Sequence, residues 1–166
     1  MKVGLALGSN VGDRLQHLQQ AKNYLLSLSK ESWHLASPLY ETEPGACPPG
    51  SAKFFNAVIE IEFDGAPRTL LTKIQAYETA HGRDRAAGRN APRTVDIDIL
   101  YFGEREVLED DLVIPHPRLS RRRYVLVPLS VIRPDTIVKG TGKTVKMLLR
   151  ELPGHEGGVR FVQQEW

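Results

Sequence analysis

The hydrophobic and polar positions of the first 28 residues indicate a buried strand followed by an amphipathic helix. Residues 2–7 form a short, largely apolar run, and Gly8-Ser9-Asn10 then marks a turn. From residue 13 to residue 28 the leucines recur at helical spacing, with Gln, His and Lys side chains on the opposite face. This part of the chain is therefore predicted to form a β-strand and then a helix.

The middle of the chain shows the patterns of two strands, a helix and a further strand. Residues 33–42 are predicted to be extended, and residues 54–63 alternate apolar and polar side chains as a half-buried strand does. Between residues 67 and 82, apolar side chains recur at helical spacing after a proline that suits the first helical turn. An arginine-rich loop then leads into a predicted strand at residues 94–102.

These elements follow the order β-α-β-β-α-β, which is that of a ferredoxin-like α+β sandwich with one antiparallel sheet and both helices on one face. Beyond them, residues 104–117 are predicted to form a short hairpin and loop, residues 124–127 a short strand, and residues 144–150 a helix. A length of 166 residues lies in the range of one domain, and no long linker divides the chain. Residues 1–166 are therefore expected to form a single domain.

Two segments are predicted to be irregular. Residues 43–51 contain three prolines and two glycines, which remove backbone donors and loosen the chain, so a loop that is either functional or mobile is expected there. Residues 140–144, Gly-Thr-Gly-Lys-Thr, resemble the end of a phosphate-binding P-loop, but the first glycine of that motif would fall at Ile137. We interpret this segment as a glycine turn before a C-terminal helix.

Composition and charge exclude several classes of protein. The 22 basic and 20 acidic residues give a net charge of +2, which argues against a protein that coats a nucleic acid. The single cysteine, Cys47, rules out an internal disulfide framework and a multi-cysteine metal cluster. No apolar run has the length of a membrane span, which takes roughly 18–20 residues, and no signal peptide is evident, so a cytoplasmic protein is expected.

The near-neutral total conceals two basic segments. Residues 83–93 carry four arginines and one aspartate, and residues 118–123 carry four arginines. Charge gathered in two short segments suits one small polyphosphate better than a long polyanion.

The segment from Arg89 to Leu100 is the most informative part of the sequence. On a strand, Asp96 and Asp98 point to one face, roughly 6.5–7 Å apart, and the apolar residues Val95, Ile97 and Ile99 that alternate with them point to the other. Such a pair also fits the solvated face of any amphipathic strand. Four arginines between residues 83 and 93 precede it, however, and they over-neutralise two carboxylates unless another anion is present. A polyphosphate held by arginine and bridged by Mg²⁺ would balance these charges.

With its flanking segments, this run resembles the 6-hydroxymethyl-7,8-dihydropterin pyrophosphokinase family of folate biosynthesis. The resemblance rests on the Pro-Arg-x-x-Asp-x-Asp pattern at residues 92–98 and extends over nearly the whole chain. The other matching segments are Gly8-Ser9-Asn10, Phe54-Phe55-Asn56-Ala57, Glu78, residues 81–85, residues 113–118 and residues 122–129.

The resemblance implies transfer of a pyrophosphoryl group from ATP to the hydroxymethyl oxygen of a reduced pterin, with release of AMP, by a monomer. It implies two Mg²⁺ ions on Asp96 and Asp98, with Arg83 and Arg93 acting beside them in catalysis. The ATP contacts that it implies are Glu78, Arg83, Arg85, Arg93, Ile99, His116 and Arg122. The pterin contacts that it implies are Thr42, Gly45, Phe54, Asn56, Asp96 and Tyr124.

Two other classes of function are alternatives to a pyrophosphokinase. Ferredoxin-like sheets with aromatic residues often bind RNA, but the aromatic motif of such modules is absent here. A metal-dependent phosphohydrolase would use Asp96 and Asp98 to activate water, and it would break down ATP without a pterin. The chain also departs from the family pattern at three positions, which are Asn90, Asp111 and Pro117.

Overall fold

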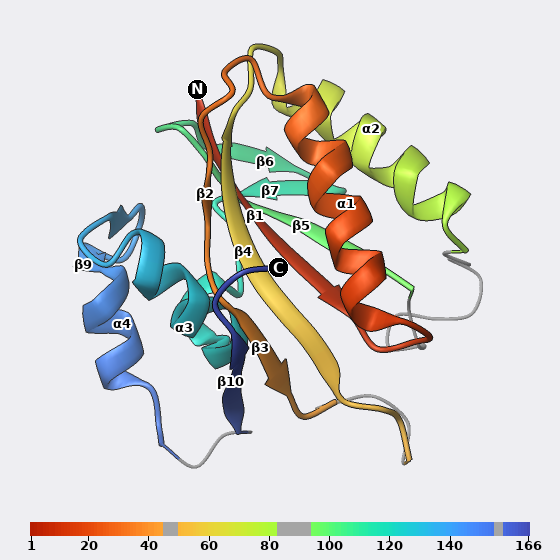
Figure 1. Ribbon diagram of the computed structural model, residues 1–166. Coiled ribbons are helices and arrows are strands. Elements are labelled where there is room, and N and C mark those ends of the chain that lie inside the picture. The colour runs from red at the N-terminus through yellow and green to blue at the C-terminus, as the bar shows by residue number, and fades with distance from the viewer. Residues whose placement is uncertain (45–49, 83–93, 155–157) are drawn as a thin grey trace.

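The computed structural model describes residues 1–44, 50–82, 94–154 and 158–166 (Figure 1). The elements in chain order are β1 (Lys2–Ser9), α1 (Arg14–Leu28), β2 (Leu35–Ala36), β3 (Leu39–Thr42), β4 (Phe54–Glu62), α2 (Pro67–Ala80), β5 (Asp96–Phe102), β6 (Val107–Glu109), β7 (Leu112–Ile114), a 3₁₀ helix (Leu119–Arg121), α3 (Arg123–Ile132), β8 (Ile137–Val138), β9 (Lys143–Thr144), α4 (Val145–Glu151) and β10 (Val159–Gln163).

One antiparallel sheet forms the centre of the molecule. Its strands follow the order β10-β3-β4-β1-β5, and β2 also pairs with β4. The helices α1 and α2 lie on the same face of this sheet (Figure 1). The elements β1, α1, β3, β4, α2 and β5 therefore give the predicted β-α-β-β-α-β order, and the ferredoxin-like fold is confirmed.

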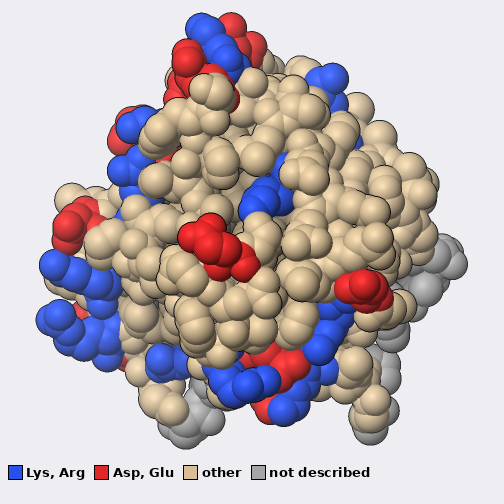
Figure 2. Space-filling view, in the orientation of Figure 1, with Lys and Arg blue, Asp and Glu red and all other residues tan. Residues whose placement is uncertain are grey.

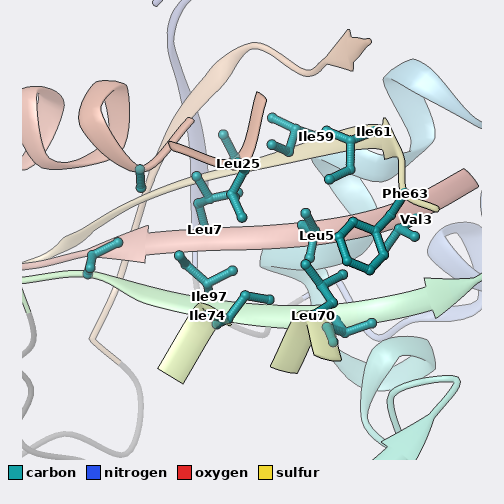
Figure 3. Close-up of a cluster of buried hydrophobic side chains, with 14 of the residues drawn as sticks. Val3, Leu5, Leu7, Leu25, Ile59, Ile61, Phe63, Leu70, Ile74 and Ile97 are labelled. Atoms are coloured by element: carbon teal, nitrogen blue, oxygen red, sulfur yellow. The ribbon is translucent and has the colours of Figure 1, made fainter. Parts of the chain in front are cut away.

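The first hydrophobic core fills the space between the sheet and the two helices α1 and α2. Alternate residues of β1 and β4 supply its sheet side, because side chains along a strand point to opposite faces (Figure 3). The residues of this core that Figure 3 labels are Val3, Leu5, Leu7, Leu25, Ile59, Ile61, Phe63, Leu70, Ile74 and Ile97. The alternation predicted for residues 54–63 is therefore confirmed.

A second hydrophobic core lies on the opposite face of the sheet, beneath α3 and α4. Its members are Val58, Leu100, Leu119, Val125, Leu126, Leu129, Val138, Val145 and Leu148. The predicted strand at residues 124–127 is wrong, because these residues belong to α3. Val125, Leu126 and Leu129 share one face of a helix, and that face covers apolar residues of β4 and β5 that a two-layer sandwich would leave exposed.

A β-bulge in β5 supplies two residues to this second core. Leu5 pairs with Ile99 and Gly4 with Tyr101, so that Leu100 is an extra residue in the strand. Leu100 and Tyr101 consequently both pack against the second core, whereas Ile99 lies in the first. The alternation of β5 is regular only up to this bulge.

The remaining elements agree with the sequence in part. The strand predicted at residues 33–42 is divided into β2 and β3 by Ser37-Pro38, and β10 was not predicted. The hairpin within residues 104–117 is present as β6 and β7. Residues 140–144 lead from β8 into α4 through Gly140 and Gly142, both at positive φ, which confirms the predicted glycine turn and C-terminal helix.

The charged surface is mixed. Lys and Arg side chains gather along the left margin and at the lower end of the face shown in Figure 2, where Asp and Glu side chains lie among them. In the part of the chain that the structure describes, no helix has the length and apolar character needed to cross a membrane.

Glu41 on β3 links the C-terminal strand and the first helix to the sheet. Its carboxylate accepts hydrogen bonds from Arg160 at 2.6 Å and from Arg14 at 3.0 Å. Arg160, and to a lesser degree Arg14, holds the pKa of Glu41 below its ordinary value although burial opposes this. The stabilisation is complete above the unfolded-state pKa of Glu41 and is lost as the pH falls through its lower folded-state pKa.

We expect Glu41→Gln to lower the free energy of unfolding by about 1 kcal/mol at pH 7, because one partner, Arg160, is largely exposed. The difference from the wild type should shrink when urea unfolding is repeated near pH 3. The control is Glu43→Gln, which removes an exposed pair with Lys53. A loss for Glu41→Gln that is the same at both pH values would contradict the prediction.

Candidate active site

Three neighbouring strands bring an amide, a glycine and a carboxylate into one row of the sheet. Gly8 of β1 pairs with Asn56 of β4 on one side and with Asp96 of β5 on the other. Directly paired residues share a face of the sheet, so the side chains of Asn56 and Asp96 lie on the face opposite α1 and α2. Ala6 pairs with Asp98 in the same register, which places the second aspartate on this face as well.

Asn56 and Thr42 form the buried polar pair of this site. The Asn56 amide Nδ2 donates a hydrogen bond to the Thr42 hydroxyl at 2.6 Å, and both residues are less than 10% exposed. Because this bond fixes the amide plane, the carboxamide is oriented before any ligand arrives. Phe54, two residues before Asn56 on β4, faces the same side of the sheet and is half-buried.

Gly8 makes room for Asn56. A Cβ atom built at Gly8 would lie 2.8 Å from Asn56 Oδ1 and 3.5 Å from Phe54 Cδ1. A glycine inside a strand often marks such a close approach. The Gly-Ser-Asn motif in the sequence does not indicate this role of Gly8. Only the register of β1 reveals the role.

We expect Gly8→Ala to displace the Asn56 amide while leaving the fold intact, since the clash is with a side chain and not with backbone. The affinity of a ligand that hydrogen-bonds to this amide should then fall by at least about tenfold, which corresponds to the loss of roughly one good hydrogen bond. The measurement is a calorimetric titration with 6-hydroxymethyl-7,8-dihydropterin, the ligand that the family resemblance implies. The control is Gly154→Ala, where an added Cβ meets nothing within 4 Å. Equal affinities of both variants would refute the role of Gly8.

Asp98 faces two cationic or potentially cationic side chains. Its Oδ2 lies 3.6 Å from Arg122 Nη1 and 4.0 Å from His116 Nε2. His116 is held in place because its backbone N–H donates to Leu100 O at 2.9 Å and its Nδ1 accepts the Arg118 N–H at 3.1 Å. With Nδ1 as an acceptor, the neutral ring carries its proton on Nε2, the atom that faces Asp98.

The beginning of α3 supplies Arg122 and Tyr124. Arg122 is the N-cap residue with an extended backbone, and its guanidinium lies 5.6 Å from the centre of the Tyr124 ring. The Tyr124 side chain remains 36% exposed. The sequence prediction of a strand here was wrong, but the helix still places both side chains at its start, where Arg122 faces Asp98.

Glu78 contacts β5 from the side of the first core, and Ile99 of β5 points into that core. Glu78 of α2 is 4% exposed, and its Oε2 accepts the backbone N–H of Ile97 at 2.9 Å. Ile97 lies between Asp96 and Asp98, so this bond fixes the backbone that carries both carboxylates. The Ile99 side chain packs into the first core. It therefore offers no exposed apolar surface on the face of the two aspartates.

The donor set of Asp96 and Asp98 fits Mg²⁺. Among the described residues, no group of three or more His, Cys, Asp and Glu side chains converges as in a closed metal site. Mg²⁺ usually takes one or two protein carboxylates and completes its octahedron with water and substrate phosphates. Both aspartates are partly exposed on one face of β5, which leaves those remaining positions open to solvent and substrate.

A protein-family comparison agrees with this geometry. The model described as 7,8-dihydro-6-hydroxymethylpterin-pyrophosphokinase (HPPK) matches residues 4–134. The chain belongs to this family. The matched range contains β4, β5, α3 and all of β1 except its first two residues, and so it includes the strands and the helix that form the site face.

Two bacterial relatives cover most of the chain. The 2-amino-4-hydroxy-6-hydroxymethyldihydropteridine pyrophosphokinase of Bacillus subtilis is 39% identical over 128 residues, 77% of this chain and 75% of the relative. The Pseudomonas aeruginosa protein of the same name is 37% identical over 134 residues, 81% of this chain and 82% of the relative.

Longer proteins contain a similar part. The folate synthesis bifunctional protein of Arabidopsis thaliana is 37% identical over 132 residues, but the match spans only 26% of that protein. The crystal structure of Plasmodium falciparum HPPK-DHPS with pteroate superposes with a TM-score of 0.69 at 16% identity, over 90% of this chain and 42% of that one. At this identity the structural likeness concerns the fold alone.

Of the residues that the family resemblance implies, the structure brings together Thr42, Asn56, Asp96, Asp98, His116 and Arg122 in the contacts and register given above. Gly45, Arg83, Arg85 and Arg93 lie outside the described residues, as does Asn90. Of the two other departures from the family pattern, Pro117 is exposed, and Asp111 pairs with Arg68 of α2.

Tyr40 is a site neighbour that sequence reasoning missed. It pairs with Asn56 across β3 and β4 and is 7% exposed, with its ring edge-to-face against Phe161 of β10. Burial raises the pKa of the Tyr40 hydroxyl above its ordinary value. The contact with β10 could not be anticipated, because that strand itself was not predicted.

Proposed function

We propose that this chain transfers the pyrophosphoryl group of ATP to 6-hydroxymethyl-7,8-dihydropterin, giving the pterin diphosphate and AMP, in tetrahydrofolate biosynthesis. The observation that carries the proposal is one sheet face on which the Asn56–Thr42 pair and the Asp96–Asp98 pair lie one strand apart, on either side of Gly8. This reaction needs a polar group that hydrogen-bonds to the pterin ring and a site that binds the polyphosphate of ATP.

The reaction forms a bond between the hydroxymethyl oxygen and the β-phosphorus, and it breaks the bond between that phosphorus and the oxygen that bridges to the α-phosphate. AMP leaves with the bridging oxygen, and the hydroxyl proton passes to water. Charge develops on oxygens on both sides of the β-phosphorus, so donors must be present on both sides.

We assign the phosphate donors to Arg122 and the Nε2–H of His116. In this proposal both turn from Asp98 to the phosphates when ATP binds, and the guanidinium fork can grip two oxygens at once. Arg83, Arg85 and Arg93 are proposed as further phosphate contacts, with Arg83 and Arg93 acting in catalysis.

We assign two Mg²⁺ ions to Asp96 and Asp98, where they would supply the positive charge that polarises the phosphate oxygens. The two carboxylates would hold these cations at a fixed position on β5. Glu78 keeps that position through its bond to the Ile97 N–H. For the nucleotide base we propose the backbone at Ile99, because β5 is an edge strand of the sheet.

The pterin site is proposed to consist of Thr42, Gly45, Phe54, Asn56, Asp96 and Tyr124. Asn56 can both donate to and accept from the edge of the heterocycle, because an amide carries both kinds of group. Phe54 on β4 and Tyr124 on α3 are proposed to stack on opposite faces of the flat ring. The chain is further proposed to act as a cytoplasmic monomer of one domain, and light scattering in solution would test the monomer.

The decisive experiment is an assay for AMP with ATP and Mg²⁺, with and without 6-hydroxymethyl-7,8-dihydropterin. We expect AMP to appear only with the pterin, in equal amounts with the pterin diphosphate, and to stop when EDTA is added. Phosphate release from ATP without the pterin would favour a phosphohydrolase instead. No nucleotide turnover under either condition would refute the proposal.

A further inference from the structure

A second row of the sheet repeats the arrangement of the first. Gly4 of β1 pairs with Glu60 of β4 on one side and with Tyr101 of β5 on the other, four residues along β1 from Gly8. A Cβ atom built at Gly4 would lie 2.3 Å from the Tyr101 ring, so only glycine leaves space for this ring across the strand. In both rows the central glycine makes room for a side chain of a neighbouring strand, and in this second row the Tyr101 hydroxyl donates a hydrogen bond to the Glu60 carboxylate.

Glu60 is the charged centre of this second row. It is 1% exposed, and its carboxylate accepts two hydrogen bonds from Arg133, at 2.6 and 3.0 Å, and one from the Tyr101 hydroxyl. Glu60 raises the pKa of Arg133, and burial raises that of Tyr101, with a further contribution from Glu60. The guanidinium therefore stays charged and the phenol stays protonated, as both must be to donate to the carboxylate.

Arg133 is the C-cap residue of α3, and Arg122 is its N-cap residue. The ten residues of α3 span about 15 Å, and the two rows, four residues apart on β1, are about 13 Å apart. The helix is therefore long enough to extend from the second row toward the first. Its C-terminal end is bound to Glu60, and its N-terminal end presents Arg122 at Asp98.

Apolar packing alone does not fix this placement. Val125, Leu126 and Leu129 hold α3 on the second core, but apolar contacts are non-directional and allow a helix to slide or roll. A bidentate arginine–carboxylate pair is directional and defines both the axial position and the rotation of the helix.

We infer that Glu60, Arg133 and Tyr101 are positioning residues for pyrophosphoryl transfer, which set where Arg122 and Tyr124 stand over the row of Asn56 and Asp96. This inference rests on the proposed function, and it adds three residues that the family resemblance did not assign. The network contacts neither substrate; it acts through α3.

The main test replaces the whole network by apolar residues of similar size, in the triple variant Glu60→Met, Tyr101→Phe and Arg133→Met. Exchanging a buried ion pair for apolar side chains is often neutral or stabilising, so the thermal unfolding midpoint should stay within about 5 °C of the wild type. The kcat/KM for ATP and for the pterin should nevertheless fall about 10–100-fold, mainly through higher KM values, because misplacement by about 1 Å can have such an effect.

Two further variants complete the design. Arg133→Lys keeps a cation beside Glu60 but loses the fork, and it should raise both KM values by a smaller factor, roughly 3–10-fold. Arg68→Met is the matched control, because Arg68 forms a similar fork with Asp111 on the exposed side of α2. Its kinetic constants should equal those of the wild type.

Amide hydrogen exchange at residues 123–127 is the readout that does not depend on activity. It should be faster in the triple variant than in the wild type, because the start of α3 is less tightly placed. If the triple variant folds, wild-type KM values and wild-type exchange rates in it would overturn the inference. If it does not fold, wild-type KM values in Arg133→Lys would overturn the inference. A wild type that releases no AMP would instead refute the proposed function, and the exchange measurement would still test the network.

Discussion

Replacing Asp98 by alanine is expected to lower the kcat for AMP formation by at least about 10²–10³-fold, the loss seen when one preorganised electrostatic partner is removed from an active site. Asp98 is the carboxylate that faces both Arg122 at 3.6 Å and His116 at 4.0 Å. Without it, Asp96 remains as the single carboxylate of the pair on β5, and the two proposed phosphate donors, Arg122 and His116, lose their contact with Asp98 in the free enzyme.

The decrease in kcat of Asp98→Ala should arise from slower phosphoryl-transfer chemistry and not from unfolding of the variant. Asp98 is partly exposed on a strand whose core contacts come from Ile97 and Ile99, so the thermal unfolding midpoint should change little. Steady-state assays over a range of Mg²⁺ concentrations measure the effect. The control is Asp110→Ala, which removes the same charge from the exposed turn between β6 and β7. Near-normal turnover of Asp98→Ala at ordinary Mg²⁺ concentrations would disprove the metal assignment.

Replacing Arg122 by alanine is expected to lower kcat/KM for ATP by about 10²-fold, with a smaller effect on pterin affinity. The guanidinium stands at the N-cap of α3 between Asp98 and the Tyr124 ring, where it can leave the carboxylate for the incoming phosphates. A decrease in kcat larger than the increase in KM would indicate that the arginine acts mainly in the transition state.

The two variants that sharpen this prediction are Arg122→Lys and Arg121→Ala. Lysine keeps the charge but loses the planar fork, so Arg122→Lys should recover only part of the activity. Arg121→Ala removes the same charge from the exposed neighbouring residue and should behave as the wild type. Equal losses for Arg121→Ala and Arg122→Ala would show that only the general basic charge of this segment matters.

The helix α3, which was predicted as a strand, shows why the site could not be predicted completely from the sequence. Tyr124 to Val127 has the composition of a short strand, and Pro128 argues against a helix. The helix forms because Val125, Leu126 and Leu129 can bury their side chains on Val58 and Leu100. That apolar patch exists only once β4 and β5 are in place.

Glu60 illustrates the same point for charge. Alternation along residues 54–63 put it on the polar face of β4, and that face is where the structure has it. Because the helices were predicted on the other face of the sheet, the Glu60 side chain was expected to be exposed to solvent. The side chain is instead 1% exposed, because α3 covers it and supplies Arg133 as its partner.

The sequence by itself determined the ferredoxin-like order of elements, the common face of Asp96 and Asp98, and the polar face of the strand that bears Asn56. Each of these follows from local spacing, because the side-chain period of a strand is two residues and that of a helix is 3.6. The tertiary structure decided which residues meet. The Asn56–Gly8–Asp96 row depends on pairing between residues far apart in the chain, and the Glu60–Arg133 network depends on a helix that folds only against the finished sheet.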